Sequence, residues 1–237
     1  IDMDDNPHLD PAARAEAQAG WTKEALRARK EGRFVHFGGM IYPEFDTDVH
    51  VCPELGLEHL AQLDHLVSID PGINTTAVIF AGFDRDNCAW IYDELYLHDN
   101  DAIHENATVL INERLTQWDV DKPTFIIDPS ARNRASVNAD NVQAAYYRAG
   151  ILALPAQNAV EAGILEVKRR LQSKPNPMLR IAERCEYLRW EIKRYRRKPN
   201  ENNQSAFDVV KRDDHAADCL RYACMARPLA PQLHTAK

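Results

Sequence analysis

The sequence lacks the features of membrane and secreted proteins. No apolar run approaches the ~18 residues of a membrane span, and the acidic first residues do not resemble a signal peptide. There is no C-x-x-C pair, and the number of cysteines is odd, so neither a zinc site of that spacing nor a disulfide framework is expected. We therefore expect a soluble, intracellular protein with reduced thiols. The five cysteines are Cys52, Cys88, Cys185, Cys219 and Cys224.

Other absences narrow the functional classes. The motif G-x-x-x-x-G-K-[ST] is missing, so the phosphate-cradling loop of ATP-driven motors is absent, and we find no internal repeat or low-complexity tract. The 237 residues, 45% of them hydrophobic, suffice for one large domain or for a domain with a lead-in. A formal net charge of -7 excludes a general affinity for polyanions, although the position of the charges matters more than their sum.

Two apolar segments each end on an Asp-Pro pair. Residues 66–69 are predicted to form a buried strand that ends at Asp70, and residues 124–127 form a similar strand before Asp128. A carboxylate at such a position is costly to desolvate unless it is paired, and a cation from solution is the simplest partner. The alternative is an Asx-type turn into the proline. Its occurrence at two strand ends makes the turn alone the less favoured explanation.

The remaining elements follow from hydrophobic periodicity. Two apolar segments separated by a four-residue polar turn are expected to pair as antiparallel strands, and later segments alternate between helix and short strand. The predicted strands are 75–83, 89–97 and 151–154, with a further short strand at 179–181, and the predicted helices are 102–118, 140–148, 160–171, 185–195 and 212–223.

The last predicted helix carries a group of acidic residues. Asp214 and Asp218 are four residues apart and share a face, where two like charges destabilise an isolated helix, and His215 flanks the same face. Acids at a helix start can be explained by capping and by the helix dipole, which accounts for Asp213 or Asp214. Asp218 lies beyond the first turn, among small and apolar neighbours, so this explanation does not cover it.

Taken together, Asp70, Asp128 and Asp218 indicate a hard, oxygen-preferring cation. Mg²⁺ or Mn²⁺ fits carboxylate ligands, whereas zinc would favour histidine and cysteine. Two such ions about 3.5 to 4 Å apart can activate a water and stabilise the leaving oxygen in phosphodiester hydrolysis. The pattern therefore predicts metal-dependent chemistry on a phosphodiester.

Residues 168–198 are rich in lysine and arginine and contain few acids. Such a region suits a phosphate backbone, although basic residues on solvated helix faces would give the same composition. The candidate DNA-binding residues are Lys168, Arg169, Arg194, Arg196 and Arg197.

Three motifs carry a resemblance to a known family. They are SIDPG at 68–72, IIDPSA at 126–131 and DHAADCLRYA at 214–223, of which D-H-x-x-D-x-x-R-Y is the most specific. The order of a strand with Asp, two antiparallel strands, a helix, a second strand with Asp and a late helix with Asp resembles the RNase H-like nuclease fold. Residues 66–226 more narrowly resemble the C-terminal nuclease domain of the large terminase subunit of tailed bacteriophages.

This resemblance implies an architecture and site roles. The fold would be α/β and RNase H-like, with a central mixed five-stranded sheet, three antiparallel strands followed by parallel ones, flanked by helices. Asp70, Asp128 and Asp218 match the catalytic, metal-binding acids. Asp214 and His215 match neighbouring positions that assist the metal site in some members. Glu94, late on the third strand, could supply a further ligand, but we expect it to be structural.

The resemblance also implies organisation and function. Residues 1–60 would lead in from an ATPase domain, 61–227 would form the nuclease domain, and 228–237 would be a flexible tail. With two Mg²⁺ or Mn²⁺ ions, the domain would cut concatemeric double-stranded DNA during genome packaging. Expected partners are DNA, the ATPase domain of the same subunit, the portal protein and the small terminase subunit, with no membrane. The expected location is the cytoplasm of the infected bacterial host.

Two alternatives remain open at this point. The chain could be a junction resolvase or a transposase core of the same fold, and a preference for four-way junctions over linear duplex would reveal a resolvase. It could also be a non-catalytic module that docks onto DNA or the portal. In that case replacement of Asp70 would leave its function untouched.

Overall fold

The computed structural model describes residues 39–72, 74–99, 104–132, 141–173, 176–198 and 209–230. Residues 1–38 of the expected lead-in and 231–237 of the expected tail lie outside these ranges. None of the helices described is both long and apolar enough to span a bilayer. The five cysteines are free thiols, as the sequence predicts.

The strands of the described residues form one mixed sheet in the order β1-β7-β4-β3-β2-β5-β6. Strands β2, β3 and β4 are antiparallel neighbours, whereas β5 runs parallel to β2 and β6 runs parallel to β5. At the other edge β7 runs parallel to β4, and β1 runs parallel to β7. The bounds are β1 Val51–Cys52, β2 Asp64–Pro71, β3 Thr75–Phe83, β4 Ala89–His98, β5 Thr124–Ile127, β6 Ala153–Pro155 and β7 Leu179–Ala182.

The mixed α/β architecture is the one predicted, but the sheet has seven strands and not five. The additional strands are β1, which has two residues, and β7, which has four. Segments this short cannot display the alternation by which a strand is recognised. Their pairing with each other and with β4 extends the sheet at its first edge.

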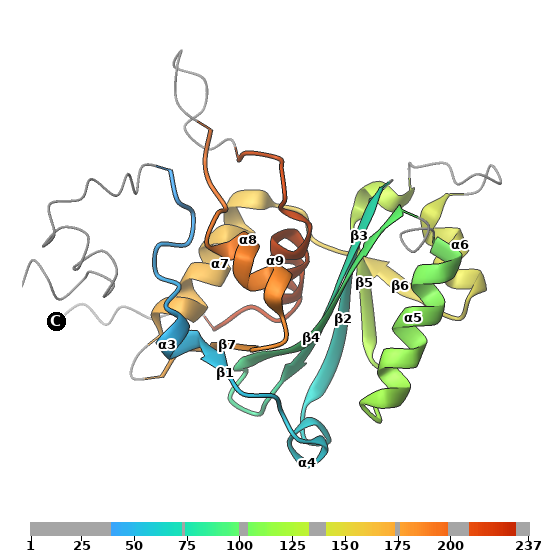
Figure 1. The fold of residues 1–237 in the computed structure, drawn as a ribbon, viewed down its shortest axis with the longest axis horizontal. Coiled ribbons are helices and arrows are strands. Elements are labelled where there is room, and N and C mark those ends of the chain that lie inside the picture. Colours follow the sequence, from blue (N-terminus) through green and yellow to red (C-terminus); the bar gives the residue numbers. More distant parts are fainter. Residues whose placement is uncertain are drawn as a thin grey trace, which may run out of the picture.

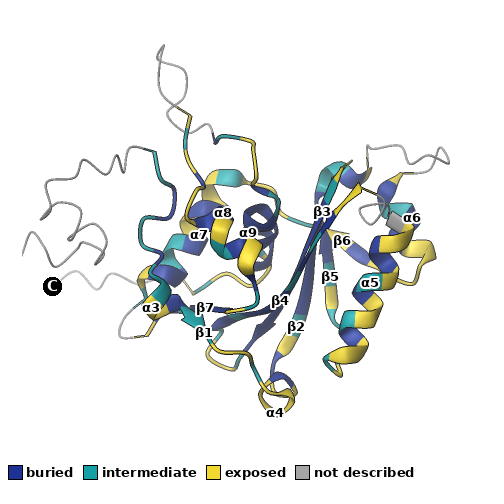
Figure 2. Ribbon diagram, in the orientation of Figure 1, coloured by how far each residue is buried: buried dark blue, intermediate teal, exposed yellow. Residues whose placement is uncertain are grey.

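Helices cover both faces of the sheet (Figure 1). Helices α7, α8 and α9 lie on one face, and α5 and α6 lie on the other. The strand residues are largely buried between these layers (Figure 2). The bounds are α3 Thr47–His50, α4 Leu57–Leu60, α5 His104–Gln117, the 3₁₀ helix η3 Pro129–Arg132, α6 Val142–Arg148, α7 Val160–Gln172, α8 Glu186–Ile192 and α9 His215–Ala226.

The alternation of side chains along the strands creates two cores. In β2, Leu66 faces α7 and α9, whereas Val67 and Ile69 belong to the core beneath α5 and α6. Ile41 and Tyr42, each 1% exposed, join the first core from the stretch that precedes β1. The two cores fix which face each strand residue presents.

Helix α9 begins three residues later than predicted. Asp213 adopts a left-handed backbone conformation with φ 51°, which is incompatible with a right-handed helix, so Asp214 becomes the N-cap and His215 the first helical residue. Within α9, buried residues face α7 and the sheet. Gly163 of α7 permits a close approach, because a Cβ at this position would lie 3.2 Å from the Cβ of Arg221.

Candidate metal centre

Asp70 and Asp128 lie side by side at the ends of neighbouring parallel strands. Ile69 of β2 is in register with Ile127 of β5, and the N–H of Asp128 donates to the carbonyl of Ile69 at 3.0 Å. Because side chains alternate along a strand, both aspartates point to the face opposite Ile69 and Ile127, which is the face covered by α9. The parallel register therefore brings the two predicted acids to one place.

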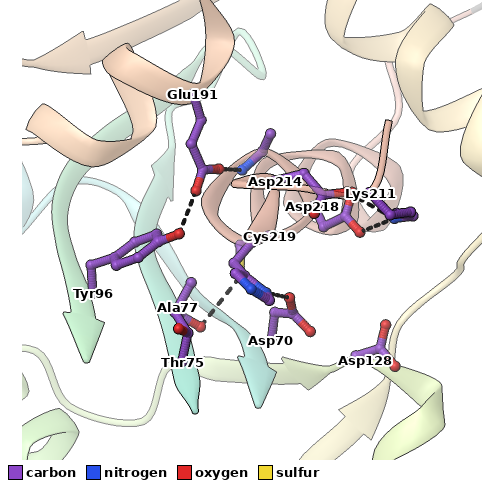
Figure 3. A network of polar contacts seen from close by, with 12 residues as sticks. Asp70, Thr75, Ala77, Tyr96, Asp128, Glu191, Lys211, Asp214, Asp218 and Cys219 are labelled. Atoms are coloured by element: carbon purple, nitrogen blue, oxygen red, sulfur yellow. Dashed lines mark hydrogen bonds and ion pairs between the residues drawn. The ribbon is translucent and has the colours of Figure 1, made fainter. Parts of the chain in front are cut away.

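Helix α9 presents a stripe of polar side chains to this end of the sheet (Figure 3). His215, Asp218, Cys219 and Tyr222 have the spacing of residues on one helical face. The Nδ1 of His215 lies 2.7 Å from Oδ2 of Asp70, and Cys219 Sγ donates to the carbonyl of Ala77 in β3 at 3.4 Å. The hydroxyl of Tyr222 donates to Oδ2 of Asp128. A single helix thus contacts both strand acids.

Asp218 lies on the same stripe and is held by three donors. Oδ1 accepts from Arg221, at 2.7 Å from Nη2 and 3.1 Å from Nε, and from the hydroxyl of Tyr195 at 3.2 Å. Oδ2 accepts from Nζ of Lys211 at 2.7 Å, and the same ammonium lies 3.1 Å from Oδ2 of Asp214. Lys211 therefore bridges the two acids of the last helix.

The second oxygen of each strand acid shows how the alternatives from the sequence combine. Oδ1 of Asp128 accepts from the backbone N–H of Ser130 at 2.7 Å, which is the Asx-type interaction expected before η3. Its other oxygen faces Tyr222. Asp128 therefore both starts a turn and contributes to the acid group, so the two interpretations are compatible.

The acid group has a strongly negative electrostatic environment. Asp70, Asp128, Asp214 and Asp218 are only 6–8% exposed. Burial and then the Asp218 carboxylate raise the pKa of Asp214. Burial raises the pKa of the Tyr222 hydroxyl, as do its hydrogen bond to Asp128 and the charges of Asp218, Asp128 and Asp70. Such a potential favours a bound cation.

His215 is part of the same electrostatic group. Its hydrogen bond to Asp70 is the largest cause of a raised pKa, which burial partly opposes. Because an ionised carboxylate only accepts hydrogen bonds, Nδ1 carries the proton in this contact. His215 therefore orients Asp70 in the structure.

The donor chemistry of the group fits a divalent cation. Buried carboxylate oxygens are the ligands that Mg²⁺ and Mn²⁺ prefer. Among the described residues, however, no three His, Cys, Asp or Glu side chains already form a metal cage. The oxygens of Asp70, Asp128 and Asp218 instead contact His215, Tyr222 and Lys211. These contacts would have to change for the carboxylates to act as ligands.

Several residues of this group were not assigned a role from the sequence. Arg221 and Tyr222 belong to the D-H-x-x-D-x-x-R-Y motif, and their positions three and four residues after Asp218 could have indicated contacts on the same helical face. Tyr195 and Lys211 lie outside any motif. Their part depends on the path of the chain before α9, which local sequence does not specify.

The predicted DNA-binding residues have different surroundings. Arg197 forms a two-pronged ion pair with Glu161, at 2.8 and 2.9 Å, and Arg169 donates to Glu166 at 2.8 Å. Nζ of Lys168 lies 3.5 Å from Oε1 of Glu44. Arg194 and Arg196 are exposed. The structure does not gather the five residues into one cluster with shared partners, and their role in DNA binding stays a prediction.

Glu94 has the structural role expected of it. Its carboxylate accepts from the backbone N–H groups of Tyr187 and Leu188, at 2.7 and 2.9 Å, in the first turn of α8. Glu191, at the other end of α8, accepts from the hydroxyl of Tyr96 and from the N–H of Ala217, both at 2.8 Å. These two acids connect α8 to β4 and to α9.

Glu191→Gln should make the free energy of unfolding less dependent on pH. Burial raises the pKa of Glu191 to about 7 from an ordinary 4.5, so the folded state retains a proton that the unfolded chain releases. This stabilisation is complete below pH 4.5 and is lost as the pH rises through 7. Glutamine does not titrate, and its amide can accept from Ala217 and donate to Tyr96.

Urea unfolding at pH 5 and pH 8 measures this effect. We expect wild-type stability to fall by on the order of 2 kcal/mol more than that of the variant between these values. Glu186→Gln, an exposed acid in the same helix, serves as the control. Equal pH dependence of Glu191→Gln and wild type would contradict the expectation.

The sheet order, the helices on both faces and the acids at the ends of β2, β5 and α9 define an RNase H-like fold. Within that class, the chain has the fold of the nuclease domains of large terminases, which confirms the resemblance carried by the sequence motifs. No protein-family model matches the sequence, and no curated protein sequence matches it.

Three solved structures illustrate the likeness. The full-length large terminase of a thermophilic bacteriophage superposes with a TM-score of 0.60 and 22% identity over 94% of this chain and 54% of that chain. The large terminase nuclease domain of bacteriophage SPP1, solved with bound Mn, gives 0.54 and 15% over 74% and 94%. The nuclease of the thermophilic phage G20c, solved with bound magnesium, gives 0.54 and 12% over 78% and 96%. The chain thus spans about half the length of the first of these proteins.

Proposed function

We propose that this chain is the metal-dependent endonuclease domain of a viral DNA-packaging terminase and that it cuts concatemeric double-stranded DNA. The observation that carries this proposal is that Asp70, Asp128 and Asp218 meet on one face of an RNase H-like sheet. The support from other proteins is that nuclease domains with the same fold have been solved with manganese or magnesium bound.

Asp70, Asp128 and Asp218 would hold two Mg²⁺ or Mn²⁺ ions, with Asp214 and His215 beside them. When bound, such ions make water more acidic and stabilise negative charge on the scissile phosphate. The protein's own part is to position the ligands. His215 orients Asp70, Tyr222 orients Asp128, and Arg221 with Tyr195 orients Asp218.

The substrate and partners follow from the same proposal. Double-stranded DNA would lie across the acid group, and the exposed Arg194 and Arg196 would contact its phosphates. An ATPase domain of the same subunit would supply movement, because a P-loop motif is lacking in this sequence. The portal protein and the small terminase subunit would direct the domain to its cleavage sites in the cytoplasm of an infected bacterium.

Conversion of supercoiled plasmid to nicked and linear forms tests the proposal. We expect conversion in Mn²⁺ or Mg²⁺ and none in EDTA. Asp128→Asn should abolish it, whereas Asp121→Asn, an exposed acid before the opposite end of β5, should not. Absence of cleavage by the wild-type chain in either metal would contradict the proposal. A strong preference for four-way junctions over linear duplex would instead favour a resolvase.

Lys211→Met should increase the affinity for Mn²⁺. The ammonium group of Lys211 lies 2.7 Å from Asp218 and 3.1 Å from Asp214, so a cation that binds these acids must compete with it. Removal of one positive charge from this half-exposed position should lower the dissociation constant by about fivefold. Isothermal titration calorimetry with Mn²⁺ in the absence of DNA gives this value. Lys122→Met, at an exposed lysine, is the control. An unchanged or weaker affinity would show that Lys211 does not compete.

A further inference from the structure

An aromatic groove adjoins the acid group. We define the aromatic groove by Tyr96, Tyr187, Trp190 and His215, which line a cavity of about 390 Å³ between the end of β4, the exposed side of α8 and the start of α9. The ring of Tyr96 stacks on that of Tyr187, with centroids 4.3 Å apart and planes at 7°. The groove is therefore a surface built from flat rings.

These rings are unusually accessible. Tyr187 is 46% exposed and Trp190 is 40% exposed, although large aromatic side chains contribute most to stability when buried. The Tyr96 side of the stack is fixed by the hydrogen bond from its hydroxyl to Glu191. Two accessible rings on a rigid support provide a platform on which another flat ring can stack.

A cationic side chain lies at the rim of the groove. The guanidinium carbon of Arg194 is 4.5 Å from the centre of the Trp190 ring. Aromatic faces combined with a neighbouring arginine are typical of single-stranded nucleic acid sites, where bases stack and the cation attracts the backbone. A positive charge on Trp190 also disfavours a lysine or arginine of a protein partner as the occupant.

The polar lining favours a base over a phosphate inside the groove. Glu186 and Asp213 contribute carboxylates, and Thr75 contributes a hydroxyl. Carboxylates repel phosphate, whereas they accept hydrogen bonds from the amino groups of adenine, cytosine and guanine. The groove thus accommodates the heterocycle while the backbone stays outside it.

The position of the groove links it to the acids. His215 lines the groove and also lies 2.7 Å from Asp70, and its ring centroid is 6.3 Å from that of Tyr96. One imidazole therefore separates the groove from the acid group. A nucleotide whose phosphate lies at the acids would have its base, or that of its neighbour, within reach of Tyr187 and Trp190.

We propose that the aromatic groove is a subsite for an unstacked nucleobase of the strand that is cut. This inference rests on the proposed nuclease function and adds to it a preference for DNA that is locally unpaired beside the scissile phosphate. The base stacks on Tyr187 and Trp190, and Arg194 attracts the adjoining phosphate. Local melting of the duplex then becomes part of substrate recognition.

Binding of a 15-nucleotide single strand with a central 2-aminopurine, in EDTA, tests the subsite. Stacking on an aromatic side chain quenches this fluorescent base, and no cleavage is needed for the signal. We expect quenching with the wild-type chain, and a dissociation constant about tenfold higher for the Tyr187→Ala/Trp190→Ala variant. Tyr187→Phe/Trp190→Phe, which keeps the rings, should bind nearly as wild type does.

Tyr147→Ala is the matched control, because Tyr147 is a 65% exposed tyrosine on α6, on the other face of the sheet. Urea unfolding of every variant establishes that it is folded. Undiminished binding by the double alanine variant would overturn the subsite and leave the groove to a protein side chain, as would an equal loss in Tyr147→Ala. Because the assay contains no metal, its outcome is separate from that of plasmid nicking, on which the proposed function depends.

Discussion

Asp70→Asn is expected to lower Mn²⁺-dependent plasmid nicking by at least about 10³-fold, because it replaces a charged ligand at the centre of the acid group by a neutral amide. The change retains the size of the side chain and an oxygen that can accept from Nδ1 of His215. The fold should therefore persist, and the loss should be one of metal binding and catalysis. The measurement is the initial rate of loss of supercoiled plasmid.

Asp64→Asn is the matched control for this experiment. Asp64 is the first residue of the same strand, is exposed, and forms an ion pair at 3.4 Å with the exposed Arg227. Its replacement should leave the nicking rate unchanged. Full activity of Asp70→Asn would refute the nuclease assignment and would favour the non-catalytic docking module considered from the sequence.

Arg221→Leu is expected to lower the free energy of unfolding by about 3–5 kcal/mol, the usual cost of removing one partner of a buried ion pair. Arg221 is completely buried, and its guanidinium holds Asp218 through two hydrogen bonds. The close approach of Gly163 shows how tightly α7 packs against this side chain. Without Arg221, the Asp218 carboxylate loses its most buried counter-charge.

Urea unfolding of a double-mutant cycle separates this loss from that of packing. Asp218→Asn removes the charge that Arg221 compensates, so the double variant Asp218→Asn/Arg221→Leu should be more stable than the sum of the single changes predicts, by roughly 1 kcal/mol or more. Arg221→Lys keeps the charge and should be intermediate. Additive effects of the two single changes would mean that Arg221 acts through packing alone.

The long elements were predictable because their residues alternate or recur over many positions. Strands β2, β3 and β4 and helices α5, α7 and α9 occur where the pattern indicated, with ends that differ by a few residues. The start of α9 depends on the left-handed conformation of Asp213, and strands β1 and β7 depend on their partners. Such features are determined by tertiary packing, which local periodicity does not contain.

The acids were predictable because each is anomalous where it stands. A carboxylate at the end of an apolar strand, or among small residues in a helix, has no local explanation, and Asp70, Asp128 and Asp218 share this property. Their partners could not be found in this way. Lys211 and Tyr195 are ordinary residues in their own segments and become important only because the chain brings them to Asp218.

The attachment of α9 gives the acid group a mechanical property. The helix carries Asp218 and also touches both strand acids, through His215 and Tyr222, while Ala217 ties it to Glu191 of α8. A slide of this one rod along its axis would alter the spacing of all three carboxylates together. Pressure applied to the outer surface of α8 would therefore be transmitted as an on or off setting of the whole centre, without rearrangement of the sheet.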